Sequence, residues 1–174
     1  DVSLEGKKIL VVIGEHTVFN SDTIKALENF ADHHNVAIYS NHLSNYFGTY
    51  MVKANLLLLI SKPQETLDYV PDIIISIGGQ TGDYPFYNYF SNPSLKCEHW
   101  RIAQDGELID TYDKLTKVFA CSERFFFERF SGSFKCEHSY FDTIKKALNA
   151  INTDLELPFS NAWIAQFLHD KLPE

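Results

Sequence analysis

Unbroken apolar runs recur along the chain and predict the strands of a buried parallel sheet. Lys8–Ile13 reads KILVVI and residues 72–77 read DIIISI, and each run ends directly at a glycine. Aliphatic and β-branched runs without polar alternation are typical of strands that helices cover on both faces. Shorter apolar segments predict further strands at 36–39, 97–102 and 117–120.

The segments between these strands carry apolar residues at helical spacing. Ser21 or Asp22 is expected to cap a first helix, in which Ile24, Leu27 and Ala31 share one face. The same spacing predicts helices at 52–60, 64–69, 84–90, 122–130, 140–151 and 159–172. Alternating strands and helices predict an α/β fold, with a doubly wound and mostly parallel sheet of about five or six strands between two helical layers.

The domain organisation is predicted from a change of composition near the end of the chain. We expect residues 1–151 to form one Rossmann- or flavodoxin-like domain, because the polar and acidic segment 152–158 is typical of a linker. Residues 152–174 would then comprise this linker and the first helix of a following domain. The only methionine is Met51, so we expect the chain to be a part of a larger protein.

Charge and composition restrict the classes of function. A net charge of -8 and a pI near 5.3 argue against a nucleic-acid-binding face, which needs clustered Lys and Arg. No apolar run approaches the ~20 residues of a membrane span. Three cysteines, an odd number, favour free thiols in a reducing compartment, so we expect a cytoplasmic protein.

One glycine-rich loop joins a predicted buried strand to a predicted helix, at 78–82 (GGQTG). Ligands of α/β proteins bind at such loops, because backbone N–H groups and the helix dipole attract anions. The spacing is not the dinucleotide fingerprint GxGxxG, no P-loop lysine follows, and the next residue is acidic. Either the loop is a tight turn that needs glycine, or it binds a small polar group. The candidate substrate-binding residues are Gly79, Gln80, Thr81, Gly82, Asp83 and Tyr84.

Other polar motifs lack the spacing that chemistry requires. Cys-Glu-His occurs twice, at 97–99 and 136–138, but no usual zinc spacing accompanies either copy. His42 and Ser44 share one predicted loop, yet no GxSxG nucleophile elbow is present. We therefore assign no catalytic and no metal-binding residue. The phenylalanines at 125–127 and 130 predict a helix that buries one face and docks another domain or subunit with the other.

Several segments together resemble the middle of one enzyme family. They are 8–14 (KILVVIG), 39–45 (YSNHLSN), 71–79 (PDIIISIGG), 98–119 (EHWRIAQDGELIDTYDKLTKVF), 122–130 and 157–173 (LPFSNAWIAQFLHDKLP). These segments are similar to 2-succinyl-5-enolpyruvyl-6-hydroxy-3-cyclohexene-1-carboxylate (SEPHCHC) synthase, a thiamine-diphosphate-dependent transferase of menaquinone biosynthesis. The resemblance covers nearly the whole chain, and 157–173 resembles the helix that opens the diphosphate-binding domain.

The resemblance implies a supporting role for this chain. Family members have three α/β domains, and the outer two bind thiamine diphosphate and magnesium. The cofactor attacks 2-oxoglutarate, carbon dioxide leaves, and the carbanion adds to isochorismate. The central domain carries neither the activating glutamate nor the GDG…N metal motif, so this chain alone is expected to bind no cofactor and to be inactive. Its expected partners are the other domains of the parent, which should be a homo-oligomer.

One departure from the family concerns the acceptor substrate. In the synthase, the segment that matches Thr81-Gly82 is followed by a basic pair that holds the acceptor's carboxylate, whereas this chain has Asp83 and Tyr84. An acid in place of two cations would repel a dianionic acceptor. We therefore expect a divergent relative whose acceptor is not isochorismate, unless other residues compensate.

Two alternatives remain open at this point. Related central domains of pyruvate oxidases and acetolactate synthases hold FAD or ADP across the strand ends, although the missing glycine fingerprint and Asp83 speak against a dinucleotide. The chain would otherwise be a stand-alone α/β module that binds a small ligand.

Overall fold

The sheet contains six strands, and every neighbouring pair is parallel. The structure is a computed structural model that describes residues 3–60, 66–133, 135–152, 156–169 and 171. The strands are β1 (Lys8–Ile13), β2 (Asn35–Tyr39), β3 (Met51–Val52), β4 (Ile73–Ile77), β5 (Glu98–Ile102) and β6 (Leu115–Phe119). Their order, β3-β2-β1-β4-β5-β6, is the order of Rossmann folds and confirms the predicted class.

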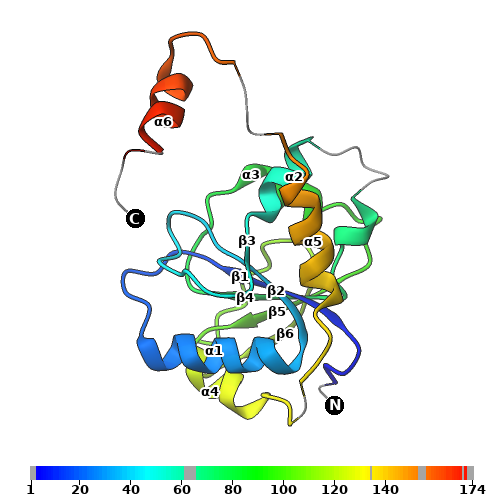
Figure 1. Cartoon of the computed structure of the whole chain (residues 1–174). Helices are drawn as coiled ribbons and strands as arrows, with labels where there is room; N and C mark the ends of the chain where they lie inside the picture. The colour runs from blue at the N-terminus through cyan, green and yellow to red at the C-terminus, as the bar shows by residue number, and fades with distance from the viewer. Residues whose placement is uncertain (1–2, 61–65, 134, 153–155, 170, 172–174) are drawn as a thin grey trace.

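Helices cover both faces of the sheet (Figure 1). They are α1 (Ser21–His33), α2 (Ala54–Ile60), α3 (Tyr84–Phe90), α4 (Glu123–Arg129), α5 (Ser139–Asn149) and α6 (Asn161–His169), with a short 3-10 turn η1 (Leu67–Tyr69). Helices α1 and α4 pack together on one face, while α2 packs with α3 and α5 on the other. The result is a three-layer sandwich, as predicted.

The core is centred on β1, which lies between β2 and β4. Its five apolar side chains from Ile9 to Ile13 are at most 1% exposed, because helices lie over both faces. At roughly 25 cal/mol per Å² of apolar area, burial of such strands is the main stabilising contribution to the fold.

The predicted ranges of β1 and α3 are confirmed, and most other boundaries move by one or two residues. The predicted helix at 52–60 is corrected: Met51–Val52 is a short strand paired with Ile38 and Tyr39, and the helix begins at Ala54. The predicted cap of α1 is also wrong. Asn20 caps this helix, because its side chain accepts a hydrogen bond from Asp22 N at 2.8 Å.

Parts of two predicted helices lie outside the described residues, at 64–65 and at 170 and 172. Of the predicted turn at 64–69, the part Leu67–Tyr69 is a 3-10 helix. Helix α6 buries no side chain completely, and Figure 1 shows it apart from the layers around the sheet. Among the described helices, none is both long and apolar enough to cross a membrane.

The aromatic helix α4 packs mainly within the chain. Phe126 and Phe127 are buried, and both rings pack against Phe30 of α1. Phe130 is half-buried, while Phe125 is 58% exposed. The predicted buried face of this helix is therefore confirmed by Phe126 and Phe127. Docking of another domain or subunit on Phe125 stays a prediction.

Candidate functional site

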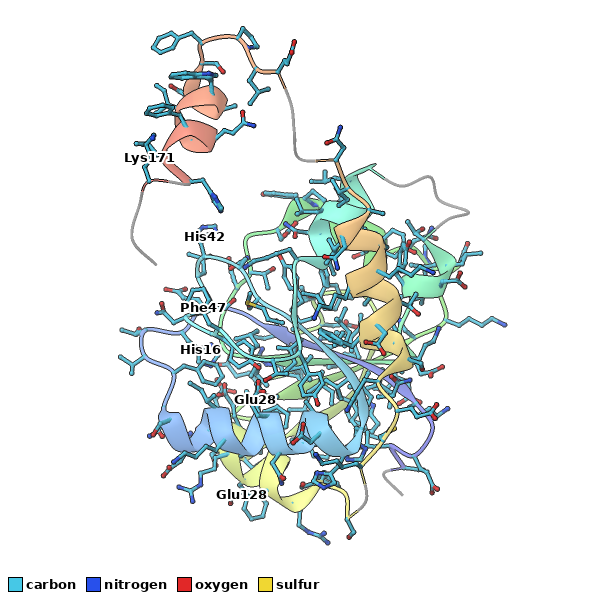
Figure 2. All side chains as sticks on the ribbon, in the orientation of Figure 1. His16, Glu28, His42, Phe47, Glu128 and Lys171 are labelled. Atoms are coloured by element: carbon cyan, nitrogen blue, oxygen red, sulfur yellow. The ribbon has the colours of Figure 1, made fainter. Side chains whose placement is uncertain are left out.

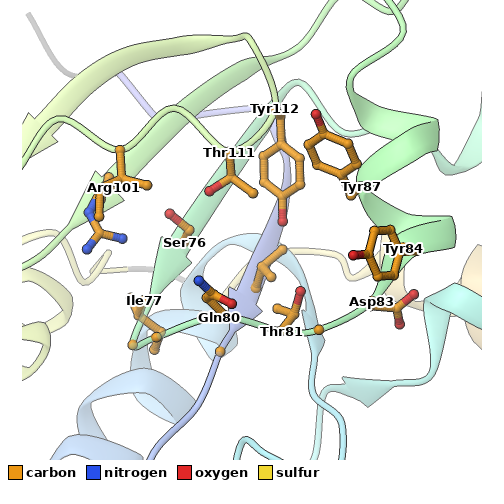
Figure 3. Close-up of a pocket in the computed structure, with 16 residues that line it drawn as sticks. Ser76, Ile77, Gln80, Thr81, Asp83, Tyr84, Tyr87, Arg101, Thr111 and Tyr112 are labelled. Carbon is orange, nitrogen blue, oxygen red and sulfur yellow. The ribbon is translucent and has the colours of Figure 1, made fainter.

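A pocket of about 420 Å³ opens at the carboxyl ends of β1, β4 and β5 (Figure 3). This is the point where strand order reverses, between β1 and β4, and it is where open α/β sheets bind ligands. The volume suits a small organic molecule. The pocket is lined by Val12, Gly14, Ser76, Ile77, Gly78, Gly79, Gln80, Thr81, Gly82, Asp83, Tyr84, Tyr87, Arg101, Ile109, Thr111 and Tyr112.

All six residues predicted from the sequence, from Gly79 to Tyr84, line this pocket. Glycine is required on both sides of this pocket, at Gly14 and at Gly78. A Cβ atom on Gly14 would lie 1.9 Å from the carbonyl oxygen of Gly79, and Gly78 has a φ of +73°. The glycines therefore allow the end of β1 and the loop after β4 to touch, as the tight-turn interpretation expects.

Three backbone N–H groups around this turn are already bonded. Gly14 N donates to Ile77 O at 2.9 Å, and Glu15 N donates to Gln80 O at 3.0 Å. Gly79 N donates in turn to Glu15 O at 3.1 Å. A pyrophosphate-binding loop needs such groups free to face the ligand. The loops after β1 and β4 instead bind each other, which disfavours a dinucleotide here.

Asp83 has two structural partners beside the pocket. Its Oδ1 accepts the N–H of Phe86 at 3.3 Å and so caps α3, and its Oδ2 accepts the hydroxyl of Tyr39. Burial, followed by the Asp83 carboxylate, raises the pKa of Tyr39, so this phenol stays neutral. Its contacts with α3 and β2 therefore orient Asp83 at the rim of the pocket.

Arg101 supplies the positive charge of the pocket, and sequence reasoning did not single it out. It lies on β5 directly opposite Ser76 of β4. Its Nε is buried and makes no hydrogen bond to any described residue. Among the described lining residues, Arg101 is the one cation and Asp83 the one carboxylate. A buried guanidinium N–H without a partner is a donor available to a carboxylate ligand.

A serine, a histidine and an aspartate meet next to Arg101. Ser76 Oγ lies 2.7 Å from His99 Nε2, and His99 Nδ1 lies 3.7 Å from Asp110 Oδ1. His99 is completely buried under the ring of Tyr112. Burial lowers the pKa of His99 to about 4, although the Asp110 carboxylate works in the opposite direction. The imidazole is therefore neutral at pH 7.

The remaining motifs from the sequence lie elsewhere. Cys97 precedes the amino end of β5, and Cys136 precedes α5. No three His, Cys, Asp or Glu side chains converge on a metal-sized site in the described part of the chain. His42 and Ser44 form no catalytic pair: His42 is exposed, as Figure 2 shows, whereas buried Ser44 donates to Ile13 O at 2.6 Å.

Comparison with known proteins adds no assignment. The chain matches no protein-family model, and a search of curated proteins returns no match.

Proposed function

We propose that this chain is the central domain of a thiamine-diphosphate-dependent 2-oxo acid decarboxylase and carboligase resembling SEPHCHC synthase. Its pocket contributes to the binding of a carboxylate on the acceptor substrate. The observation that carries the proposal is Arg101, a cation with an unpartnered buried Nε in a pocket at the switch point of the sheet. Arg101 belongs to the segment 98–119, which is one of the segments that resemble the family.

Arg101 supplies one positive charge where the family has a basic pair after the position of Gly82, so it replaces that pair only in part. A guanidinium binds a carboxylate through charge-assisted hydrogen bonds, each contributing about 1.5–3 kcal/mol. Asp83 keeps one negative charge at the rim of the same pocket. One cation beside one carboxylate favours a monoanionic over a dianionic acceptor. This supports an acceptor other than isochorismate.

The described residues do not fit a site for the cofactor itself. Magnesium and a diphosphate need converging carboxylate oxygens and free backbone N–H groups. The described residues hold no such cluster of acids, and the N–H groups of Gly14, Glu15 and Gly79 at the turn are already bonded. The same bonded N–H groups disfavour FAD or ADP. We therefore place the thiamine diphosphate and magnesium of the parent on its other domains.

The test uses the full-length protein that the gene encodes. The proposal predicts a downstream GDG…N motif and the release of carbon dioxide from a 2-oxo acid. Arg101→Gln should raise the KM for the acceptor about tenfold or more. Decarboxylation of the donor should continue at the wild-type rate. The control is Arg129→Gln, which removes an exposed arginine on α4 and should change neither value.

Two results would contradict the proposal. A full-length protein without 2-oxo acid decarboxylation would exclude the enzyme class. An unchanged acceptor KM in the Arg101→Gln enzyme would remove the pocket from substrate binding.

A further inference from the structure

Three side chains of β4 and β5 share one face of the sheet at the floor of the pocket. Ser76 pairs in register with Arg101, and His99 lies two residues before Arg101 on the same strand. Side chains two residues apart on a strand point to the same face. The register therefore places Ser76 next to both His99 and Arg101, and Figure 3 shows Ser76 beside Arg101 in the pocket.

The partners of His99 define which ring nitrogen carries the proton. Asp110 Oδ1 is fixed by the N–H groups of Lys114 and Leu115, at 2.9 and 3.0 Å, and faces Nδ1. A carboxylate opposite Nδ1 favours the tautomer with its proton there. His99 Nε2 is then an acceptor, and the hydroxyl of Ser76 donates to it.

Ser76 also lines the pocket, so this residue is within reach of a molecule bound there. A hydroxyl bonded to a neutral imidazole, which a carboxylate orients, is the arrangement of an activated nucleophile. The 3.7 Å between Nδ1 and Asp110 exceeds a hydrogen bond, but such contacts often tighten only when substrate is bound.

We propose that Ser76, His99 and Asp110 form an acyl-transfer site that hydrolyses a small ester or thioester whose acyl group carries a second carboxylate. Arg101 binds that carboxylate, and Ser76 is the nucleophile. The activity is separate from decarboxylation of a 2-oxo acid, which requires none of the triad residues. If this hydrolytic activity is not found, the proposed role as a central domain still stands.

The chemical steps balance with water as the only co-reactant. Ser76 Oγ adds to the acyl carbon, and its proton moves to His99 Nε2 while Nδ1–H faces Asp110. The C–O or C–S bond of the leaving group breaks, and the alcohol or thiol departs with that proton. Water then adds to the acyl-serine and gives a proton to His99. The bond between the acyl carbon and Ser76 Oγ then breaks, and the carboxylic acid leaves. His99 returns the proton to Ser76 Oγ.

The test measures covalent labelling of this chain by a fluorophosphonate, a probe that reacts with activated serines. Mass spectrometry of peptides should locate the adduct on Ser76 in the wild type. Ser76→Ala should abolish it, and Asp110→Asn should slow it about tenfold or more, because the imidazole loses its orienting carboxylate. The control Ser94→Ala removes an exposed serine after α3 and should label at the wild-type rate.

A second measurement keeps the proposal testable if loss of the serine hydroxyl impairs folding. Ser76→Cys retains a nucleophile beside His99, and iodoacetamide should modify Cys at position 76 faster than Cys97, Cys121 or Cys136. With mono(4-nitrophenyl) succinate, the wild type should release nitrophenol faster than with 4-nitrophenyl butyrate. Arg101→Gln should remove that preference. Absence of an adduct on Ser76 in the folded wild type would overturn the proposal, as would an equal rate for Asp110→Asn.

Discussion

Asp83 shows how a residue at the rim of the pocket also holds the scaffold. Its carboxylate caps α3 and accepts the hydroxyl of Tyr39, whose ring stacks on Phe86 at 4.5 Å between centroids. The contacts that cap α3 therefore also hold the Asp83 side chain in position at the pocket. Substitution at this position changes stability and ligand binding together.

We predict that Asp83→Ala lowers the free energy of unfolding by about 1–3 kcal/mol, because α3 loses its cap and Tyr39 its partner. Asp83→Asn should cost less, since its amide oxygen can still accept the N–H of Phe86. Urea unfolding followed by circular dichroism measures both values. Glu107→Ala, at an exposed position, is the control and should stay within about 0.5 kcal/mol of the wild type. Equal stability of Asp83→Ala would refute the assigned cap.

The lowered pKa of His99 predicts that the folded chain loses stability in acid. The pKa of His99 is about 4 in the folded chain and near 6.5 when unfolded, so the unfolded state takes up a proton first as the pH falls. The stabilisation is fully present above pH 6.5 and is lost between pH 6.5 and 4. The effect amounts to at most about 3 kcal/mol at 1.36 kcal/mol per pKa unit. Unfolding of the wild type and of His99→Gln across this range should show a smaller loss in the variant. Parallel curves would contradict it.

At the scale of residues, the sequence predicts one wall of the pocket and misses the other. The run from Gly79 to Tyr84 is visible because a glycine loop after a buried strand has a known geometric meaning. The sequence does not reveal that Arg101 and Ser76 belong to the pocket. These positions are 25 residues apart, and only the pairing of β4 with β5 brings them together. The alternation in CEHWRI places His99 and Arg101 on one face, but it does not show which neighbouring strand they meet.

At the scale of elements, one side-chain pair connects the loop after β1 to the start of α4. His16 Nε2 lies 2.9 Å from Glu123 Oε1, and His16 Nδ1 lies 3.1 Å from Gly14 O. Burial lowers the pKa of His16, but the hydrogen bonds to Glu123 and Gly14 outweigh it and leave the pKa raised. The protonated imidazole can donate through both nitrogens and so holds the glycine turn against α4.

This pair gives a prediction of opposite sign to that for His99. A raised pKa contributes stability that is complete below the unfolded value near 6.5 and fades as the pH rises through the folded value. Glu123→Gln should therefore lower Tm more at pH 5.5 than at pH 8.5. Glu128→Gln, on the exposed side of α4, is the control and should show a small difference at both pH values. A larger effect of Glu123→Gln at pH 8.5 would exclude the assigned pairing.

Elements with strong apolar runs are predictable, whereas their order is not. The short, β-branched run of β1, which ends at a glycine, is typical of a strand in a sheet covered on both faces. Strand β3 has two residues, Met51 and Val52, and further apolar residues follow in α2. The sequence pattern therefore predicts a single helix where the chain forms a strand and then a helix. Since β3 lies at the edge next to β2, its omission leaves the Rossmann and flavodoxin orders indistinguishable from sequence.

At the scale of the whole molecule, the pocket is a consequence of topology. Crossovers to opposite faces separate the loops after β1 and β4, and a crevice forms between the strands at which the order reverses. Here the two loops bond to each other and use the backbone N–H groups that would hold a pyrophosphate. Side chains supply the charge of the crevice, with Arg101 from β5 and Asp83 from the position that caps α3.

The most direct test of the carboxylate-binding pocket is a thermal-shift series on the chain with the monocarboxylates propionate and butyrate, FAD, ADP, NAD and thiamine diphosphate plus magnesium. A ligand that binds the folded state raises Tm by mass action. The account predicts a rise with the small carboxylates that Arg101→Gln abolishes and Arg129→Gln retains, and no rise with the nucleotides or the thiamine cofactor. A rise with FAD or ADP, or none with either carboxylate, would contradict a carboxylate-binding supporting domain.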